Sequence, residues 1–342
     1  MTTIPWGLPT SDLDDAVARA ANDLEQWRGA RMLLTGATGF LGSWLTATLL
    51  RANDLLGLGL RLVVVTRTPA AVPLATGPML QLVAADVRKL PSVGQVDLVV
   101  HGATASSRFD GGEADPRTMA GTILDGTRAA LEAASASRAR VLFLSSGAVY
   151  GRQTADAVPE EHLGGPDPLE PGAAYAEAKR LAENWCAATT AAGDAAVVVA
   201  RLFAFVGPRI PLDGHFAAGN FLADVLASRS VRVNGDGRPL RSYLYAGDLP
   251  EWLVAVLARG VPGRAYNVGS PEPVSIVDLA RRTAALADQP LDVQITGRPS
   301  AGPPHRYVPD TRRAEQELDL RPRVGLDEAL RRTLSWYAAR RQ

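Results

Sequence analysis

The chain has 342 residues, 46% of them apolar, and its 36 basic and 36 acidic side chains give a formal net charge of zero. This length and composition allow a large buried core, in one big domain or in two joined domains. The balanced charge, without a basic tail or patch, argues against a nucleic-acid partner, and the single cysteine, Cys186, excludes a disulfide framework and a cysteine-rich metal site.

The N-terminal segment shows no targeting signal. Its sequence, MTTIPWGLPTSDLDDA, is acidic and has no apolar segment after basic residues, so it is not a signal peptide. No apolar run in the chain reaches the roughly 18 residues that a membrane span needs. We therefore expect a cytoplasmic protein without a membrane partner.

Residues 1–30 are expected to form an N-terminal helical extension. Ser11 has the side chain of an N-cap residue, and apolar residues follow it at helical spacing: Leu13, Val17, Ala20, Ala21 and Leu24. This pattern predicts an amphipathic helix that packs outside the first strand.

From residue 31 onward, predicted strands and helices alternate. Short runs rich in Val and Leu, apolar on both faces, predict buried parallel strands over 31–35, 61–66, 80–84, 97–101, 140–145 and 196–201. Helical patterns lie between them, over 41–53, 116–138 and 173–192. The alternation predicts an α/β fold with a doubly wound parallel sheet.

The stretch TGATGFLG at 35–42 puts Gly36, Gly39 and Gly42 where the first strand turns into a helix. In such a turn the first glycine permits the tight bend, the second lets the backbone approach a pyrophosphate, and the third lets helix and strand pack closely. The free amides at the helix N-terminus then face the phosphates. The stretch therefore predicts a dinucleotide site.

This site defines the domain organisation that we expect. Residues 31–202 form a Rossmann-type dinucleotide-binding domain. Residues 203–342, where Gly and Pro become frequent, form mainly a smaller, mixed α/β substrate-binding part. Residues 241–270 contain late returns to the sheet, such as the segment 265–270.

The ends of the next two strands bear on which dinucleotide is bound. The strand at 61–66 is followed by Arg67, and not by the Asp or Glu that usually holds the ribose of NAD. Arg67 can instead pair with the 2′-phosphate of NADP. Asp86, after the strand at 80–84, is placed to contact the adenine. The predicted cofactor is therefore NAD or NADP.

Two later stretches contain the predicted catalytic residues. FLSSGAVYG at 143–151 runs from a strand into a loop with two serines, and AYAEAKR at 174–180 puts Tyr175 and Lys179 on one helix face. A phenol with an ordinary pKa of about 10 is too protonated at neutral pH to act as a base. We expect Tyr175 to be the acid/base, Lys179 and the nicotinamide ring to lower its pKa, and Ser146 to polarise the substrate.

Eight stretches occur in one order along roughly residues 30–337: TGATGFLG (35–42), HGAT (101–104), SSGAVYG (145–151), YAEAK (175–179), RLFAFVGP (201–208), RSYLYAGDL (241–249), YNVGS (266–270) and DTRRAEQELDL (310–320). In this the chain resembles the extended short-chain dehydrogenases/reductases of the NAD(P)-dependent nucleotide-sugar epimerase/dehydratase family. The resemblance implies a bound nicotinamide dinucleotide and a nucleoside-diphosphate sugar as substrate. It also implies a homodimer formed through two helices per subunit, one of them carrying Tyr175 and Lys179.

The resemblance also implies which residues contact the ligands. Contacts with the dinucleotide are expected from Gly36, Thr38, Gly39, Phe40, Leu41, Gly42, Arg67, Asp86, Val87, Ala103, Tyr175 and Lys179. Contacts with the substrate are expected from Ser106, Ser107, Asn220, His215 and Arg241.

Two positions depart from the family's pattern. Ala204 stands where an Asn is frequent beside the sugar diphosphate. The family's late arginine has no clear match, and Arg298 and Arg306 are the nearest candidates. Arg241, by contrast, matches the family's diphosphate-contacting arginine.

The residues after Ser146 bear on the reaction. In the family, dehydratases carry an Asp-Glu pair there and decarboxylases keep the Glu, whereas this chain has Gly147 and Ala148. Since neither side chain can move a proton, the leading prediction is an epimerase, acting at C4 through a transient 4-keto sugar. The alternatives are an NADPH-dependent ketosugar reductase, which Arg67 favours, then a 4,6-dehydratase or decarboxylase, and last a dinucleotide-binding regulator without turnover.

Overall fold

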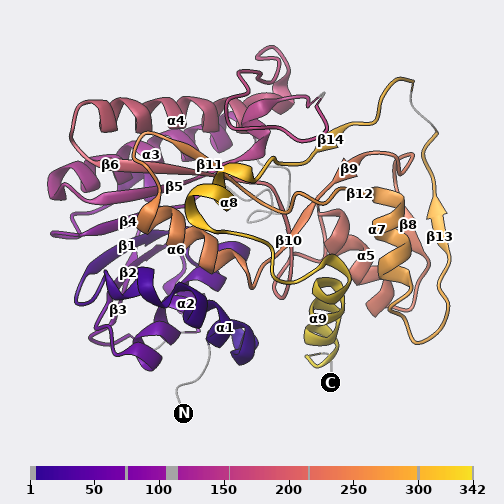
Figure 1. Ribbon diagram of the computed structural model, residues 1–342, viewed down its shortest axis with the longest axis horizontal. Helices are drawn as coiled ribbons and strands as arrows, with labels where there is room; N and C mark the ends of the chain where they lie inside the picture. Colours follow the sequence, from indigo (N-terminus) through magenta and orange to yellow (C-terminus); the bar gives the residue numbers. More distant parts are fainter. Residues whose placement is uncertain are drawn as a thin grey trace.

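A parallel sheet of seven strands lies at the centre of the computed structural model, which describes residues 5–73, 76–104, 115–153, 155–214, 216–298 and 301–340 (Figure 1). The strands lie in the spatial order β11-β6-β5-β4-β1-β2-β3. Their bounds are β1 (Arg31–Thr35), β2 (Arg61–Thr66), β3 (Leu80–Ala84), β4 (Leu98–His101), β5 (Arg140–Ser146), β6 (Ala196–Leu202) and β11 (Ala265–Val268). The predicted fold class, a doubly wound parallel sheet, is confirmed.

The strand order reverses between β1 and β4. From β1 the chain moves outward to β2 and β3, then returns to β4 on the other side of β1 and continues to β5 and β6. In an open parallel sheet, ligands bind in the crevice at the carboxyl ends of the strands where the order reverses. Gly36 follows β1 and Gly102 follows β4, so the glycine-rich turn lies at this point.

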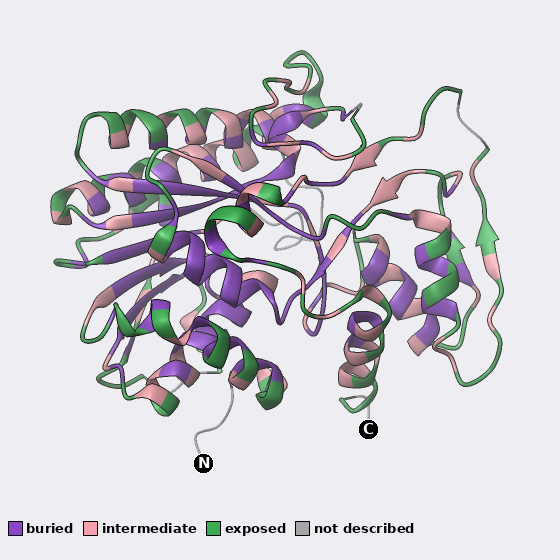
Figure 2. Cartoon of the chain, in the orientation of Figure 1, coloured by how far each residue is buried: buried purple, intermediate pink, exposed green. Residues whose placement is uncertain are grey.

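Helices cover both faces of the sheet. The pair α2 (Phe40–Leu56) and α6 (Leu249–Arg259) lies on one face, and the pair α3 (Pro116–Ser137) and α4 (Ala174–Ala191) on the other. Successive strand residues point to opposite faces, so Leu34 packs toward α2 while Leu33 packs toward α3 and α4. The strands are therefore mostly buried on both sides, as Figure 2 shows, except the edge strand β3, in which only Leu80 is buried.

The N-terminal extension adds a layer over α2 and α6. It consists of a 3-10 turn, η1 (Pro5–Gly7), and the helix α1 (Thr10–Glu25), which packs on both of these helices. The predicted N-cap at Ser11 is wrong. The residue before the helix is Pro9, in an extended conformation without a side-chain cap, and Ser11 is an exposed residue of the first turn.

Buried acidic side chains tie α1 to distant parts of the chain. Asp12 accepts a hydrogen bond from the hydroxyl of Tyr245 at 2.5 Å and pairs with Arg332 at 2.5 Å. Asp23 pairs with Arg259 of α6 at 2.9 Å. Because Tyr245 and Arg332 belong to the C-terminal part, the extension holds that part and the sheet domain together.

The smaller part lies beyond the carboxyl ends of β5 and β6. Its helices α5 (Ala217–Leu226), α7 (Ile276–Ala284) and α9 (Leu326–Ala338) share one apolar core. Its short strands pair as β7 (Ala204–Val206) with β10 (Tyr243–Tyr245), β8 (Val231–Val233) with β13 (Val293–Ile295), and β9 (Leu240–Arg241) with both β12 (Val274–Ser275) and β14 (Arg306–Tyr307). The remaining short elements are η2 (Pro69–Ala71), η3 (Val87–Lys89), η4 (Gly147–Tyr150), η5 (Pro171–Ala173) and α8 (Arg312–Leu318).

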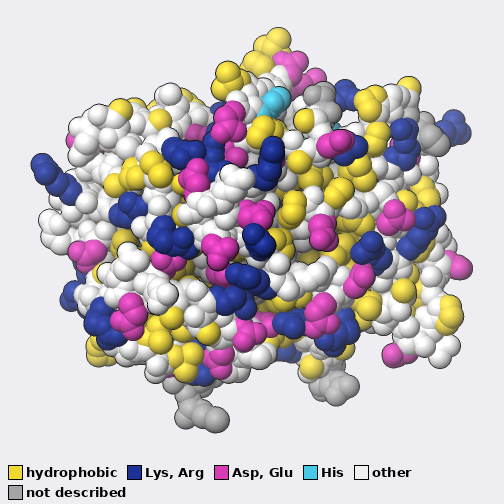
Figure 3. Space-filling view, in the orientation of Figure 1, with side chains coloured by type: hydrophobic (Ala, Val, Ile, Leu, Met, Phe, Trp, Pro, Cys, Tyr) yellow, Lys and Arg dark blue, Asp and Glu magenta, His cyan; other side chains and the backbone are white. Residues whose placement is uncertain are grey.

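The surface carries mixed charge. On the face that Figure 3 presents, Lys and Arg side chains alternate with Asp and Glu, and no broad field of one sign appears there. This agrees with the formal net charge of zero. In the part of the chain that the structure describes, no helix is long and apolar enough to cross a membrane.

Candidate active site

The glycine-rich turn between β1 and α2 requires glycine at two positions for its own packing. Gly36 has a φ of +73°, and a Cβ there would lie 2.5 Å from the carbonyl carbon of Gly102. A Cβ on Gly42 would overlap the carbonyl oxygen of Gly36. Side chains at these positions would therefore strain the turn itself, whatever it binds.

Gly39 is different, because the protein leaves room for a side chain there. Its φ is −70°, and the nearest described atom to a Cβ would be the Gly36 carbonyl oxygen at 3.5 Å, an ordinary contact. This room adjoins the first turn of α2, where the amides of Phe40, Leu41 and Gly42 have no partner within the helix. A pyrophosphate placed against these amides accounts for the glycine, so the turn fits a dinucleotide.

Arg209 supports this turn from the smaller part of the fold. Its guanidinium donates to the carbonyl of Thr38 at 3.1 Å and lies over the ring of Trp6, 5.3 Å from its centre. Arg209 adopts a φ of +74°, which is unusual for a residue with a side chain. The N-terminal extension thus reaches the predicted cofactor loop through Trp6 and Arg209, a contact that no sequence motif indicates.

The ends of β2 and β3 bring Arg67 near Asp86. The carboxylate of Asp86 caps η3 by accepting from the Arg88 amide at 2.9 Å, and it pairs with the Arg88 guanidinium at 2.7 Å. The hydrogen bond from Arg88, with the charges of Arg88 and Arg67, lowers the pKa of Asp86. Val87 is buried in the same turn. That Arg67, Asp86 and Val87 contact the dinucleotide stays a prediction.

The end of β4 is held beside the same turn. His101 is buried, with its ring nitrogens 2.7 Å from the Thr35 hydroxyl and 3.2 Å from the Thr127 hydroxyl. Burial lowers the pKa of His101 to about 3, so the ring is neutral and its role is structural. The amide of Ala103 donates to the Thr35 hydroxyl at 3.3 Å, which places the segment after β4 next to Gly36.

Ser146 and Tyr175, which lie far apart in the sequence, meet at the carboxyl edge of the sheet. Ser146 is the last residue of β5, and its Oγ accepts from the Ala148 amide at 3.2 Å, which caps η4. Tyr175, from the first turn of α4, is buried close to Ser146, whose hydroxyl influences the pKa of the phenol. The structure therefore brings the predicted acid/base and the predicted polarising hydroxyl together.

Lys179 lies one turn after Tyr175 and is buried against the sheet. Its Nζ donates to the Leu144 carbonyl at 2.7 Å, and burial lowers its pKa to about 8. Burial raises the pKa of Tyr175, opposed by the hydrogen bond with Ser146. In the chain alone the net shift of the Tyr175 pKa is therefore upward. That Lys179 and the cationic nicotinamide ring together favour the phenolate stays a prediction.

We predict that Lys179 makes folding stability rise with pH. The pKa of Lys179 is about 8 in the folded chain and 10.5 as the ordinary value, so between these limits the unfolded chain binds a proton that the folded chain has lost. Relative to Lys179→Met, the wild-type free energy of unfolding should increase by roughly 2 kcal/mol from about pH 8 to about pH 10. Urea unfolding of both proteins across this range measures it, and parallel pH curves would contradict the prediction.

Gly147 has no room for a side chain. A Cβ there would lie 2.8 Å from the ring of Phe203, a buried residue between β6 and β7. The ring centre of Phe203 lies 4.8 Å from that of Tyr307 and 6.2 Å from that of Tyr150. An acidic side chain at position 147 would therefore collide with the aromatic packing beside the catalytic loop. Ala148, by contrast, is partly exposed.

Tyr307 is a site residue that the sequence analysis missed. It belongs to β14, and its hydroxyl lies 3.3 Å from Oγ of Ser146 and 3.4 Å from the carbonyl oxygen of Leu202. Burial raises its pKa, so the phenol stays protonated at neutral pH. Arg306, one of the two candidates for the family's late arginine, precedes it directly in the sequence.

Arg241, the predicted diphosphate contact, lies next to Tyr307. The two residues are paired in the parallel ladder of β9 and β14, and the guanidinium lies 5.5 Å from the centre of the Tyr307 ring. Its hydrogen bonds go to the Leu240 carbonyl at 3.1 Å and to Nδ1 of His305 at 3.0 Å. Burial lowers the pKa of Arg241, and no carboxylate pairs with it within the described ranges. Such a cation is suited to bind an anion.

The remaining predicted substrate residues in the described part of the chain form no hydrogen bond or ion pair with Ser146, Tyr307 or Arg241. Asn220 lies in α5, where its amide donates to the Gly214 carbonyl at 2.9 Å. Arg306 pairs with the exposed Asp156 at 3.0 Å and stays a candidate for the late arginine. Three predicted substrate contacts lie outside the described residues: Ser106, Ser107 and His215.

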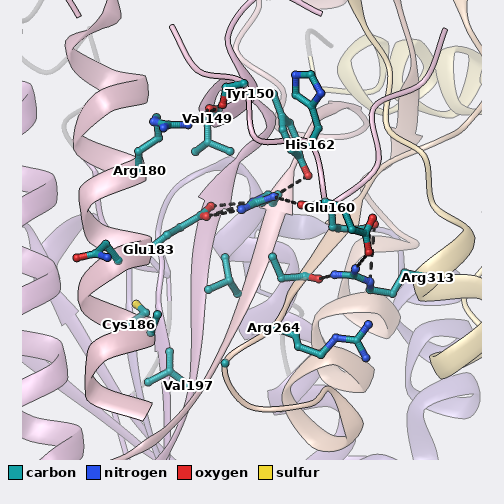
Figure 4. Close-up of a pocket in the computed structure, with 18 residues that line it drawn as sticks. Val149, Tyr150, Glu160, His162, Arg180, Glu183, Cys186, Val197, Arg264 and Arg313 are labelled. Atoms are coloured by element: carbon teal, nitrogen blue, oxygen red, sulfur yellow. Dashed lines mark hydrogen bonds and ion pairs between the residues drawn. The ribbon is translucent and has the colours of Figure 1, made fainter. Parts of the chain in front are cut away.

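A cavity of about 480 Å³ lies beside α4 (Figure 4), and none of Ser146, Tyr175 and Lys179 is among the residues that line it. Its central feature is an ion pair between Glu183 of α4 and Arg201 of β6 at 2.7 Å. Glu183 also accepts from the Ser145 hydroxyl at 2.5 Å, and Arg201 donates to the Tyr150 hydroxyl at 2.8 Å. Cys186 lines the same cavity, and burial raises the pKa of its thiol to about 12. This cluster anchors α4, and with it Tyr175, to the sheet.

Comparison with curated proteins points to nucleotide-sugar enzymes. UDP-glucuronic acid decarboxylase 1 of Xenopus tropicalis is 31% identical to this chain over 312 residues, which make up 90% of this chain and 72% of that protein. UDP-glucuronic acid decarboxylase 1 of Arabidopsis thaliana is 29% identical over 315 residues, or 91% of this chain and 70% of that protein.

Solved structures share the fold over almost its whole length. UDP-glucose 4-epimerase from Thermotoga maritima superposes with a TM-score of 0.77 at 21% identity, covering 91% of this chain and 100% of that one. A dTDP-glucose 4,6-dehydratase from Streptomyces venezuelae, solved with NAD bound, superposes with a TM-score of 0.74 at 25% identity, covering 91% and 98%. Residues 32–269 match a sequence family described as the NAD dependent epimerase/dehydratase family. The chain is therefore an enzyme of the NAD-dependent epimerase/dehydratase family.

Proposed function

We propose that this enzyme oxidises C4 of the sugar in a nucleoside-diphosphate sugar and so forms a 4-keto intermediate. The observation that supports this is the meeting of Ser146, Tyr175 and Lys179 at the carboxyl edge of the sheet. This edge is also where the strand order reverses and where the glycine-rich turn lies.

Each of the three residues has a distinct part in this reaction. The bound nicotinamide dinucleotide supplies the hydride acceptor. Tyr175 takes the proton from the C4 hydroxyl, and Ser146 donates a hydrogen bond to the same oxygen as it becomes a carbonyl. Lys179, one turn further along α4, keeps a positive charge beneath Tyr175 and favours its ionised form.

Arg241 supports a diphosphate-containing substrate. Its guanidinium is partly buried and has neutral partners, the Leu240 carbonyl and His305, since burial and the charge of Arg241 lower the pKa of His305. An anionic diphosphate would give this cation the charged partner that it lacks among the described residues. Asn220 stays a predicted substrate contact.

Two fates of the 4-keto intermediate have separate support. The curated relatives favour decarboxylation over the epimerisation that the sequence predicts. A 4-keto hexuronate is a β-keto acid, and its carbon dioxide leaves with the electron pair passing to the C4 carbonyl, so cleavage of the C5–C6 bond needs no acid at Gly147 or Ala148. The enolate would then take up a proton at C5, and the hydride held by the dinucleotide would return to C4. Those two residues equally suit epimerisation, in which hydride returns to the opposite face of C4. They argue against elimination of water, which needs a proton-moving group.

The test is a direct comparison of substrates. Freshly purified enzyme with NAD is incubated with UDP-glucuronic acid, UDP-glucose and UDP-galactose, and products are followed by mass spectrometry and NMR. Loss of carbon dioxide from the uronate would identify a decarboxylase, and interconversion of the two hexoses at constant mass would identify a 4-epimerase. If neither these sugars nor their dTDP and GDP counterparts reduce the bound dinucleotide, the proposed oxidation at C4 is wrong.

The choice of dinucleotide, the assembly and the location stay predictions. Arg67 favours NADP or an NADPH-dependent reductase, whereas the family is NAD-dependent. A homodimer through the helix that carries Tyr175 and Lys179 would use the outward side of α4, where Leu181 is exposed. A cytoplasmic location is likewise part of the proposal.

A further inference from the structure

We propose that Tyr307 is a positioning residue for Ser146, which it holds in the orientation of a hydrogen-bond donor toward the substrate. This inference rests on the proposed oxidation at C4. It assigns a role to a phenol that comes from the smaller part of the fold and lies 161 residues away from Ser146 in the sequence.

A serine hydroxyl can donate one hydrogen bond and accept two. One acceptor site of Ser146 Oγ is taken by the Ala148 amide at 3.2 Å. The Tyr307 hydroxyl, at 3.3 Å, can take the other. Both acceptor sites are then filled, and the single proton of Ser146 remains for Tyr175 or for the substrate oxygen beside it.

The surroundings of Tyr307 fix its ring and leave its hydroxyl few choices. The ring centre of Phe203 lies 4.8 Å from that of Tyr307. The guanidinium carbon of Arg241 lies 5.5 Å from the centre of the same Tyr307 ring. The other acceptor near the hydroxyl is the Leu202 carbonyl at 3.4 Å. The bond to Ser146 is long for two hydroxyls, as catalytic hydrogen bonds often are before substrate binds, and it can shorten in the complex.

The packing also explains why a phenol holds this position. The ring of Phe203 excludes any side chain at Gly147, so the loop after Ser146 cannot supply a polar group from that residue. β14 runs beside β9, and its pairing puts Tyr307 level with Arg241. A group from the substrate-binding part thus takes over the support of Ser146, between the predicted diphosphate contact and the catalytic hydroxyls.

A double-mutant cycle tests whether Tyr307 acts through Ser146. Tyr307→Phe keeps the ring and removes the hydroxyl, and we expect kcat to fall about tenfold with KM nearly unchanged, less than the 10²–10³-fold typical of a lost direct donor. In a Ser146→Ala background, the same change should alter kcat by less than about twofold, because the partner is gone. Tyr266→Phe is the matched control. Tyr266 lies in β11, its hydroxyl donates to Glu317 at 2.7 Å, and its loss should leave kcat unchanged.

Two kinetic results would overturn the proposal. One is an unchanged kcat in Tyr307→Phe. The other is an equal loss of kcat from Tyr307→Phe with and without Ser146, which would mean that the two hydroxyls act independently.

A second measurement does not depend on turnover and so separates this proposal from the proposed function. Tyrosine isotope-labelled at Cζ gives one NMR signal per phenol, and the signal of Tyr307 is the one absent from Tyr307→Phe. This signal should shift in Ser146→Ala, while that of Tyr266 should not. An unshifted Tyr307 signal would overturn the contact even if no substrate had yet been found.

Discussion

Replacing Tyr175 by Phe is expected to abolish turnover while leaving the fold and the dinucleotide site intact. The variant keeps the ring, which packs with the core under α3 and α4. It removes the hydroxyl that would take the proton from C4, a contribution of about 10²–10⁴-fold in rate. We expect a loss of kcat at the upper end of this range, because the hydroxyl also lies close to Ser146, the other predicted hydroxyl of the site.

The measurement combines kinetics with binding. Turnover of the nucleotide sugar identified above is compared with the affinity for NAD, followed by fluorescence titration, in wild type and in Tyr175→Phe. The dinucleotide affinity should change by no more than about threefold, since loss of one neutral hydrogen bond has a modest effect. A variant that retained wild-type kcat would contradict the whole assignment of the site.

The second large effect is expected at Gly39, where an alanine should impair dinucleotide binding without affecting the fold. Its φ of −70° suits any residue, and a Cβ would meet described protein atoms no closer than 3.5 Å. Against a bound pyrophosphate the same Cβ would be overpacked, which typically costs 1–3 kcal/mol. The affinity for NAD should therefore fall about tenfold to a hundredfold.

Gly36→Ala is the contrasting variant in the same turn. Its φ of +73° and the 2.5 Å approach to the Gly102 carbonyl carbon should destabilise the fold by about 3 kcal/mol. Thermal unfolding without dinucleotide distinguishes the two variants. The melting temperature of Gly39→Ala should equal that of wild type, and the melting temperature of Gly36→Ala should be well below that of wild type. If Gly39→Ala bound NAD as wild type does, the pyrophosphate would not lie against this glycine.

The sheet could be predicted because its strands are local patterns. Most strands before residue 202 are short apolar runs, which are typical of strands buried on both faces; the edge strand β3, with Gln81 exposed, is the exception. The trio of Ser146, Tyr175 and Lys179 could be predicted for a similar reason, since the last two are one helical turn apart and the serine ends a strand. The predicted N-cap at Ser11 failed because helix ends are set within one or two residues by local geometry.

The missed residues all depend on contacts between distant parts of the chain. Tyr307 meets Ser146 across 161 positions, and Arg209 meets Thr38 across 171. No local spacing encodes such contacts, because they arise when the smaller part packs against the sheet. The burial of Tyr175, which raises its pKa, and the bond of the Lys179 ammonium to the Leu144 carbonyl also depend on tertiary packing that the sequence does not show.

Phe203 also constrains how this site can change in the course of evolution. While its ring occupies the space beside Gly147, a mutation that introduced a carboxylate at position 147 would displace a buried aromatic side chain and destabilise the protein before any new activity could be selected. A smaller residue at position 203 would itself cost about 3–5 kcal/mol if the replacement were alanine. Either change alone therefore lowers stability, so the effect of a carboxylate at position 147 depends on which residue stands at position 203.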